Sequence, residues 1–457
     1  MIEKKVLREL RAAVGRNKVF ADQEYLLAYS YDAMAVEYLP DAVVFPEHDQ
    51  DIAAVLRICH EHRVPLVPRG AGVGYSGGAL AIQGGVVLVF TRMNRILRLD
   101  TENFLAEVEP GVITADLQAA AESKGLFYPP DPASLKTSTI GGNVAENAGG
   151  PRCFKYGVTG NYVLGLEGYL MNGEKIRLGS ETIKNVAGYD LKSLVIGSEG
   201  TLVVVTRVVL RLLPLPMRRL LFRVDFSDLV DGARFVQNII RGHVQPSVLE
   251  FMDRRSLQAV YDFQQLPLAE KVKAAVLVEI DGSPAEVTER EGLFEKQIAA
   301  VGPLGWQRAE TFSKQEALWA TRRNISPAIA KLKPKKINED IVVPGALIPE
   351  MVSYIEGLAD EYGLCIVLFG HFGDGNIHTN LMVDPDDSEE MKRAEIVLDR
   401  IFKRVIELGG TISGEHGIGL SKKPFMHYQF SPVEMQLFRD IKKVFDPLNL
   451  LNPGKIF

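Results

Sequence analysis

Cysteine, long apolar runs and basic clusters are all scarce in this chain. Only Cys59, Cys153 and Cys365 occur among 457 residues, and none of them forms a C-x-x-C pair. A scattered, odd-numbered set excludes a disulfide scaffold and a thiolate zinc site, and it indicates a reducing compartment. The apolar runs are of strand length, and the charged N-terminus lacks the apolar core of a signal peptide. We therefore expect a cytoplasmic protein that reaches the inner membrane only through partners.

Net positive charge is also absent. The formal charge is −6 and the pI is near 5.9, which argues against nucleic acid as a partner. The composition is that of an ordinary globular protein, with 46% hydrophobic and 24% charged residues. A chain of this length is too long to fold around a single hydrophobic core, so we expect two or three domains.

The first half of the chain reads as short strands around glycine-rich turns. Residues 42–45, 49–62 and 64–68 predict a strand, an amphipathic helix and a second strand, which together form a β-α-β unit. Residues 128–160 are rich in Gly, Pro and Asn and show little periodicity, so we predict a loop or ligand-lining backbone there.

A pattern change at Pro214-Leu215-Pro216 predicts a domain boundary. Strands at 220–224 and 274–280 then alternate with helices at 229–241 and 284–301, which favours helices on an antiparallel sheet. The tail from residue 434 begins as a helix.

The segment Gly370-His371-Phe372-Gly373-Asp374-Gly375-Asn376-Ile377-His378 predicts a tight hairpin. Asp374-Gly375 is a dipeptide preferred by two-residue turns, and counting outward from it places His371 opposite His378. Opposed side chains on one face lie roughly 5 Å apart at Cβ, close enough for two imidazoles to bind one metal ion.

A third candidate ligand is Glu415, within Ser413-Gly414-Glu415-His416-Gly417. Two His and one carboxylate leave coordination positions open, as catalytic sites do. The alternative is that the histidines are hydrogen-bonded polar residues at a sheet margin. Both interpretations stay open on the residues alone.

The run Gly72-Val73-Gly74-Tyr75-Ser76-Gly77 matches G-x-G-x-x-G after a strand. A dinucleotide fold of the Rossmann type needs a helix directly afterwards and an acid at the end of the next strand, and neither is present. Glycine turns here, at 141–150 and at 197–200 could instead present backbone N–H groups to an extended, phosphate-bearing cofactor. Three unrelated tight turns are the alternative.

Taken in order, six segments resemble the FAD-linked vanillyl-alcohol oxidase and p-cresol methylhydroxylase (PCMH) superfamily, within it the glycolate oxidase D-subunit and D-2-hydroxyacid (D-lactate) dehydrogenase family. They are PRGAGVGYSGGA (68–79), PPDPASLKTSTIGGNVAENAGG (129–150), IGSEGTL (196–202), GHFGDGNIH (370–378), SGEHGIG (413–419) and LNPGKIF (451–457).

The resemblance implies an α+β fold with a two-part PCMH-type FAD-binding domain (1–217), a ferredoxin-like cap domain with the His hairpin (218–412) and a helical C-terminal segment that returns to the FAD domain (413–457). It implies FAD held without a covalent bond, because Tyr75 and Ser76 stand where covalently tethered members have His or Cys. The cofactor residues it implies are Pro68, Arg69, Gly70, Ala71, Gly72, Gly74, Tyr75, Ser76, Gly77, Asp131, Gly141, Gly142, Asn143, Asn147, Gly150, Gly157, Gly197, Glu199, Gly200, Val205 and Asn452.

In the metal-dependent members of this family, the matching positions make His371, His378 and Glu415 ligands of a divalent Zn, Mn or Fe ion and His416 the catalytic base. Arg322, Asn380 and Ser326 fall on substrate-holding positions. The family's further substrate lysine is replaced by Asn338, with Lys336 two residues away. This departure favours a short monocarboxylate such as glycolate or D-lactate.

The function this implies is FAD-dependent oxidation of a small D-2-hydroxy acid to the 2-oxo acid. The electron acceptor would be a quinone, an iron–sulfur partner subunit or an electron-transfer flavoprotein, and a homo-oligomer or hetero-complex is expected. One alternative is a flavoprotein transferase of the alkyl-dihydroxyacetone-phosphate synthase type, although its expected run of histidines is missing. Another is a non-catalytic subunit, for which an incomplete set of site residues would be expected.

Overall fold

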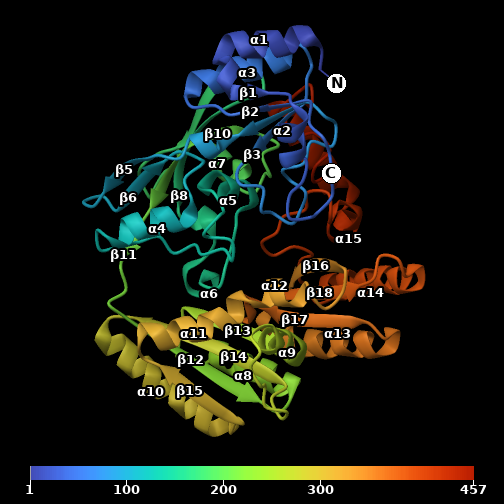
Figure 1. Cartoon of the computed structure of the whole chain (residues 1–457). Coiled ribbons are helices and arrows are strands. Elements are labelled where there is room, and N and C mark those ends of the chain that lie inside the picture. The colour runs from blue at the N-terminus through green and yellow to red at the C-terminus, as the bar shows by residue number, and fades with distance from the viewer. Residues whose placement is uncertain (1) are drawn as a thin grey trace. The chain divides into compact units, whose positions relative to one another are not determined.

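The computed structural model describes residues 2–457, which fold as two compact units. Unit 1 comprises residues 2–149, 158–215 and 415–457, and unit 2 comprises residues 150–157 and 216–414 (Figure 1). We propose that unit 1 is the predicted FAD-binding domain with its returning tail, and that unit 2 is the predicted cap. The short segment 150–157, which the prediction assigns to the first domain, groups with unit 2.

Unit 1 begins with a small mixed sheet. Its strand order is β1-β2-β4-β3, in which β2 and β3 run parallel to β4. The predicted β-α-β unit is confirmed, because a helix connects β2 to β3 and buries its apolar face in the same core. The elements are β1 (Val19–Phe20), β2 (Ala42–Val44), β3 (Leu66–Arg69), β4 (Val86–Val89), α1 (Lys4–Val14), α2 (Gln23–Ala28) and α3 (Asp49–Glu61).

A second, antiparallel sheet of unit 1 has the order β5-β6-β10-β8-β9. Along β10 buried residues alternate with half-buried ones, so one face of the sheet packs against the core and the other faces solvent. The strands are β5 (Ile96–Asp100), β6 (Leu105–Val108), β8 (Val163–Tyr169), β9 (Lys175–Gly179) and β10 (Val204–Arg211).

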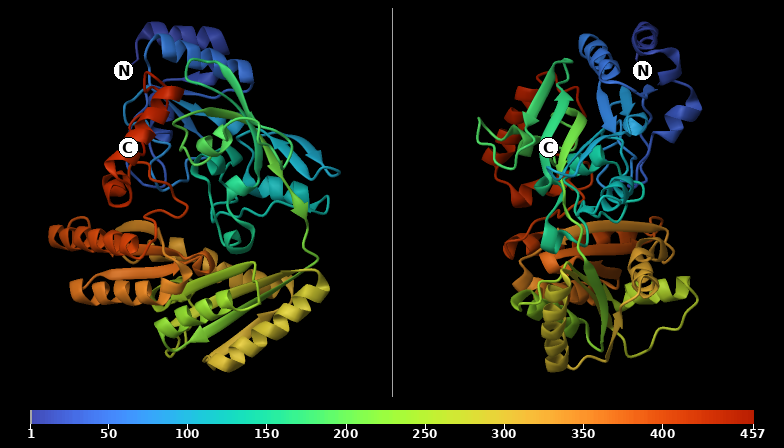
Figure 2. Two further views of the ribbon diagram at one scale, coloured as in Figure 1. Left: turned by 180° about the vertical axis from the view of Figure 1, so that it is seen from behind. Right: turned by 90° about the vertical axis from the view of Figure 1, so that its left-hand side faces the viewer.

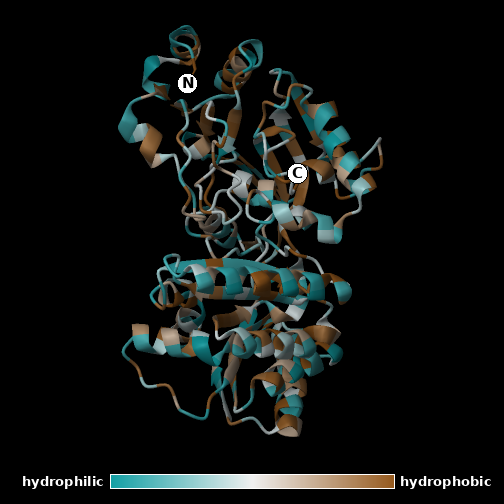
Figure 3. Ribbon diagram, turned by 90° about the vertical axis from the view of Figure 1, so that its right-hand side faces the viewer, coloured by the Kyte–Doolittle hydropathy of each residue, from teal (hydrophilic) through white to brown (hydrophobic). Residues whose placement is uncertain are grey.

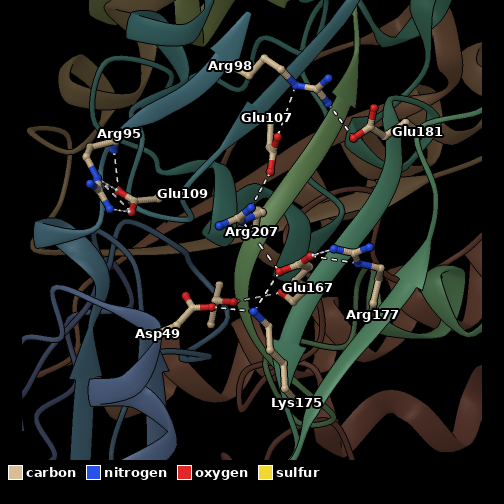
Figure 4. Close-up of polar contacts among 11 residues, drawn as sticks. Asp49, Arg95, Arg98, Glu107, Glu109, Glu167, Lys175, Arg177, Glu181 and Arg207 are labelled. Carbon is tan, nitrogen blue, oxygen red and sulfur yellow. Dashed lines mark hydrogen bonds and ion pairs between the residues drawn. The ribbon is translucent and has the colours of Figure 1, made fainter.

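The solvent-facing side of this sheet carries a ladder of alternating charges that crosses all five strands, drawn in Figure 4. Arg98 pairs with Glu107 at 3.4 Å, and Glu107 accepts a hydrogen bond from Arg207 at 2.7 Å. Glu167 lies 3.8 Å from Arg207 and also pairs with Arg177. Exposed pairs of this kind contribute only about 0–1 kcal/mol each. The ladder therefore marks a solvated sheet face rather than a reactive site.

The remaining elements of unit 1 include several short helices and strands. The tract 128–160, predicted as loop or ligand-lining backbone, also contains two short helices that the prediction missed. The tail helix is confirmed, with Ser431 and Glu434 forming a capping box at its start. The elements are α4 (Thr114–Glu122), β7 (Leu126–Phe127), α5 (Ile140–Glu146), α7 (Leu191–Val195), β11 (Leu213–Pro214), α15 (Met426–Gln429) and α16 (Pro432–Phe445). The second helix of the tract, α6 (Cys153–Tyr156), belongs to unit 2.

Unit 2 is built on a seven-stranded antiparallel sheet with the order β15-β12-β14-β13-β17-β18-β16. The first four strands have the ferredoxin-like order, and the other three extend that sheet. The strands are β12 (Arg218–Phe226), β13 (Val248–Asp253), β14 (Ala274–Gly282), β15 (Gly305–Ala309), β16 (Lys335–Val342), β17 (Cys365–Gly370) and β18 (Asn376–Val383).

Helices connect the successive strands of this sheet except β17 and β18, and α10, yellow in Figure 2, runs along it. Side chains of α9, α11 and α12 share one core with Met252, Val367, Phe369 and Met382 from the strands, so these helices cover one sheet face. The helices are α8 (Leu229–Arg241), α9 (Arg254–Phe263), α10 (Pro284–Val301), α11 (Phe312–Arg323), α12 (Ile325–Ile329), α13 (Ile348–Tyr362) and α14 (Ser388–Glu407).

In Figure 3 the strands are largely brown while the helices show both teal and brown, as amphipathic packing requires. Within residues 2–457, no helix has the length and hydropathy of a membrane span.

Candidate active site

The hairpin that carries the two histidines has a longer turn than the sequence predicts. The paired residues are Phe369 and His378. The prediction that His371 opposes His378 across a two-residue turn is therefore wrong. A 3-10 turn over Phe372–Asp374, followed by Gly375 at φ +87°, adds residues to the connection. His371 consequently lies just beyond the end of β17, at the start of the turn.

The two imidazoles nevertheless meet. Their ring centroids are 5.1 Å apart at an angle of 83°, and the residues are only 4% and 6% exposed. Glu415 directly follows Gly414, whose backbone N–H donates to Asp340 of unit 2 at 2.9 Å. One ligand atom from each of His371, His378 and Glu415 lies within 4.8 Å of the others. Two neutral imidazoles and one carboxylate form a donor set that fits a divalent transition-metal ion.

Glu250 joins this cluster from the neighbouring strand β13. One of its carboxylate oxygens contacts His371 Nδ1, and the other accepts a hydrogen bond from Arg322 Nε at 2.5 Å. Burial alone would raise the pKa of the Glu250 carboxyl, but the charge of Arg322 and the hydrogen bonds from His371 and Arg322 outweigh it and lower the pKa to about 2. Sequence reasoning missed Glu250. The available signal was an acid within the apolar run Val248-Leu249-Glu250-Phe251-Met252.

The predicted substrate residues lie at the face of the unit 2 sheet that carries His378, either on a strand or on the helices that cover this face. Asn380 is two residues beyond His378 on β18 and is fully buried. Its Oδ1 has no hydrogen-bond partner within the described part of the chain. Arg322, on α11, places its guanidinium 4.8 Å from the centre of the Phe369 ring. Ser326, on α12, accepts a hydrogen bond from Lys336 at 2.9 Å.

The register of β16 against β18 locates the two alternative lysine positions. Asn338 is directly opposite Asn380, and Lys336 is opposite Met382. Because alternate residues share a face, Lys336 and Asn338 lie on the same side as His378. Lys336 is the farther of the two from the histidines along the strand.

His416, the predicted base, groups with unit 1. Its ring lies 5.2 Å from the ring of Tyr75 in the first glycine loop, and its Nε2 is 4.0 Å from a carboxylate oxygen of Glu415. Gly417 follows at φ +82°, where a Cβ would lie 2.2 Å from Glu146. Glycine therefore allows the chain to pass closely beside the carboxylates that line this segment.

The first glycine loop, which begins at Pro68 and runs to Gly77, leaves β3 through Arg69. This residue is 6% exposed and donates from Nη2 to the carbonyl of Tyr31 at 2.8 Å. Its Nε and Nη1 have no hydrogen-bond partner in residues 2–457, and burial lowers its pKa. A buried guanidinium with two unmatched donors fits an anionic group such as a pyrophosphate. Gly70 is required beside it, because a Cβ there would lie 2.3 Å from Thr139.

The second glycine segment is helical, which sequence reasoning did not anticipate. Gly141, Gly142 and Asn143 form the start of α5, capped by the Thr139 hydroxyl, and Asn147 ends it at φ +52°. Glycines favour this helix little, so its position is set by contacts. Asp131 is buried in the preceding loop. The flanking residues Gly150 and Gly157 group with unit 2.

The third glycine turn anchors the C-terminal segment. Glu199, at φ +52°, is buried and accepts backbone hydrogen bonds from Ile418 and Gly419, both at 2.7 Å. Burial raises the pKa of its carboxyl to about 7 against the effect of those hydrogen bonds. Asn452 donates to the carbonyls of Gly78 and Glu199 at 2.8 and 2.7 Å.

The other predicted members of this turn lie beside it. Gly197 and Gly200 both have positive φ, and a Cβ at Gly200 would lie 2.7 Å from Pro68. Val205 is half-buried on β10. The structure thus brings the first and third glycine segments and the tail together within unit 1.

Comparison with known proteins identifies the family. Residues 40–179 match the model of an FAD binding domain, and residues 215–456 match the FAD linked oxidase C-terminal domain. The fold is that of PCMH-type flavoproteins: p-cresol methylhydroxylase with substrate bound superposes with a TM-score of 0.82 at 18% identity, over 99% of this chain and 96% of that one. The chain belongs to the FAD-linked oxidase family.

Two curated relatives match nearly the whole chain. Glycolate oxidase subunit GlcD of Bacillus subtilis is 44% identical, over 100% of this chain and 97% of its own length. D-lactate dehydrogenase of Anaerostipes hadrus is 35% identical, over 97% and 95%. The expected family, fold class and enzyme class are confirmed, and the protein is an FAD-dependent oxidoreductase.

Proposed function

We propose that this protein oxidises a small D-2-hydroxy acid, of the glycolate or D-lactate type, to the 2-oxo acid. Two relatives support the substrate class, because glycolate and lactate are both 2-hydroxy acids. The observation that carries the proposal is the cluster of the buried His371 and His378 with the half-buried Glu415. The carboxylate and neighbouring hydroxyl of a 2-hydroxy acid could chelate a cation held by three protein ligands.

We propose that these residues hold a divalent Zn, Mn or Fe ion and that the glycine segments hold FAD without a covalent bond. When bound, the cation supplies Lewis-acid polarisation of the substrate hydroxyl, and the flavin supplies the acceptor for the hydride from C2. The protein supplies alignment and proton transfer. Arg69 is the residue best suited to the FAD pyrophosphate, since two of its buried nitrogens lack partners in residues 2–457.

His416 would accept the substrate's hydroxyl proton, because an imidazole titrates near neutral pH. It directly follows the proposed metal ligand Glu415, and its Nε2 lies 4.0 Å from a carboxylate oxygen of that residue. A base this close to a bound cation would be near the substrate hydroxyl that the cation polarises.

Arg322 would hold the substrate carboxylate. Its Nε is bonded to Glu250, so its terminal nitrogens are left as the pair for a bidentate contact. Asn380 would orient the substrate through an amide that is only partly satisfied by the protein. Electrons would then leave the flavin to a quinone, a partner subunit or an electron-transfer flavoprotein.

An anaerobic titration of the FAD-loaded protein with D-lactate, glycolate and L-lactate tests this proposal. We expect a short D-2-hydroxy acid or glycolate to bleach the flavin band and to yield one 2-oxo acid per flavin reduced. L-lactate provides the stereochemical control. If no 2-hydroxy acid bleaches the flavin, the oxidase proposal fails, and a non-redox transferase of the same fold becomes the better account.

A further inference from the structure

Glu250 is an unusual residue for its position. It is fully buried in the middle of β13, where a carboxylate costs several kcal/mol unless its oxygens are bonded. Both oxygens are engaged, one with His371 and the other with Arg322. A carboxylate with both oxygens engaged by side chains is poorly placed to bind a metal or accept a proton. Its contacts instead connect a metal ligand to the proposed substrate clamp.

The pairing of β13 with β17 places Glu250 beside His371. In the antiparallel pairing of β13 with β17, Phe251 is opposite Gly370. One step further along the same register brings Glu250 opposite His371, at the point where β17 enters the turn. The contact therefore depends on backbone pairing rather than on a flexible loop.

The contact also selects one tautomer of His371. An ionised carboxylate can only accept hydrogen bonds, so Nδ1 of His371 must carry the hydrogen. Nε2 then presents its lone pair for a cation. We infer that Glu250 is a positioning residue, which holds His371 in its metal-binding tautomer and, through Arg322, ties the metal ligand to the carboxylate clamp. This inference rests on the proposed function.

A glutamine at this position could not serve both contacts. Its amide oxygen can accept from His371 or from Arg322, but the amide nitrogen then presents hydrogens to the other donor. If the nitrogen faces His371, it favours the tautomer with the hydrogen on Nε2, which cannot bind a cation. The substitution Glu250→Gln therefore preserves volume while removing one contact in either orientation of the amide.

The test is the affinity of the FAD-loaded, metal-stripped protein for Zn²⁺, measured by competition with a chromophoric chelator. Glu250→Gln is expected to weaken Zn²⁺ binding by about 10- to 100-fold, the usual effect of losing a partner of a metal-bound histidine. FAD content should be unchanged. The matched control is Asp253→Asn, which removes a second buried carboxylate from the same strand without touching His371.

The Zn²⁺ affinities of the two variants and of the unmodified protein distinguish a positioning role from a general effect. Weaker Zn²⁺ binding in Glu250→Gln but not in Asp253→Asn, with both variants folded by circular dichroism, supports the positioning role. Equal affinity in Glu250→Gln and the unmodified protein overturns it. Equal weakening in both variants also overturns it, because a general loss of buried charge would then be the cause. Failure of the proposed metal site itself would appear differently, as an unmodified protein that binds no Zn²⁺.

Discussion

At the scale of single residues, the site divides into groups that the sequence could reveal and one that it could not. His371, His378 and Glu415 were predicted, and the structure brings their ligand atoms together. Histidine is rare in this chain, with eight in total, so paired histidines in a glycine-rich segment raised the expectation of a metal site without deciding it. Glu250 gave a weak signal, because its role depends on the neighbour that the sheet places beside it.

The proposed base, His416, is the residue whose role is most easily tested. We expect His416→Ala to retain FAD and to lower turnover by about 10²- to 10⁴-fold, the usual contribution of a general base. The measurement is steady-state oxidation of the best 2-hydroxy acid, with FAD content read from the absorbance spectrum. His427→Ala is the control, since His427 is exposed on α15 and contacts the carbonyl of Pro424. Unchanged turnover in His416→Ala would remove it from the mechanism.

At the scale of elements, local patterns predicted most boundaries, and two failures have physical causes. The Asp374-Gly375 pair favours a two-residue turn, yet Phe372 is buried and stacks on Phe251 at 4.2 Å. That packing accompanies a longer turn than local preference indicates. Helix α5 was missed because Gly141 and Gly142 are poor helix formers, whereas close packing against Pro110 admits only glycine at position 141.

Asp253 links two elements of unit 2 and predicts a pH dependence of stability. Its carboxylate accepts hydrogen bonds from the backbone of Ser256, at the start of α9, and of Leu368 on β17. Burial raises its pKa from 3.8 to about 6, although those hydrogen bonds lower it. Because the folded state binds this proton more tightly than the unfolded state, the stabilisation is complete below about pH 3.8 and is lost as pH rises through 6.

We therefore expect the stability advantage of the unmodified protein over Asp253→Asn to shrink between pH 4 and pH 7. The change should be on the order of 2 to 3 kcal/mol in the free energy of unfolding. Urea unfolding followed by tryptophan fluorescence reports on the relevant unit, because both tryptophans, Trp306 and Trp319, lie in unit 2. A difference that stays constant over this pH range would contradict the assignment.

At the scale of the whole molecule, sequence order carried more information than any single motif. The six segments that resemble the family are spread from residue 68 to residue 457, and the two family models cover both halves of the chain. The Pro214-Leu215-Pro216 run also lies where unit 1 gives way to unit 2. What the sequence did not reveal is the grouping of residues 150–157 with unit 2, because this depends on contacts with distant strands, such as that of Lys155 with Asp281.

Several residues of the proposed site are consecutive in the segment that follows unit 2, residues 415–419. Glu415 follows the last residue of unit 2, His416 comes next, and Ile418 and Gly419 are bonded to Glu199 within unit 1. The proposed metal ligand, the proposed base and an anchor to the third glycine turn thus lie within five consecutive residues. This arrangement supports the proposal that cation and flavin act on one substrate.

The most direct test of that proposal is the anaerobic reduction of bound flavin by D-lactate or glycolate in three samples of the same FAD-loaded protein. One sample is as purified, one is stripped of metal with a chelator, and one is stripped and then restored with Zn²⁺ or Mn²⁺. We predict that stripping slows flavin bleaching by at least about 100-fold, since the cation contributes several kcal/mol to the reaction, and that restoration recovers the rate. A stripped sample that keeps its FAD and bleaches as fast as the others would contradict the account.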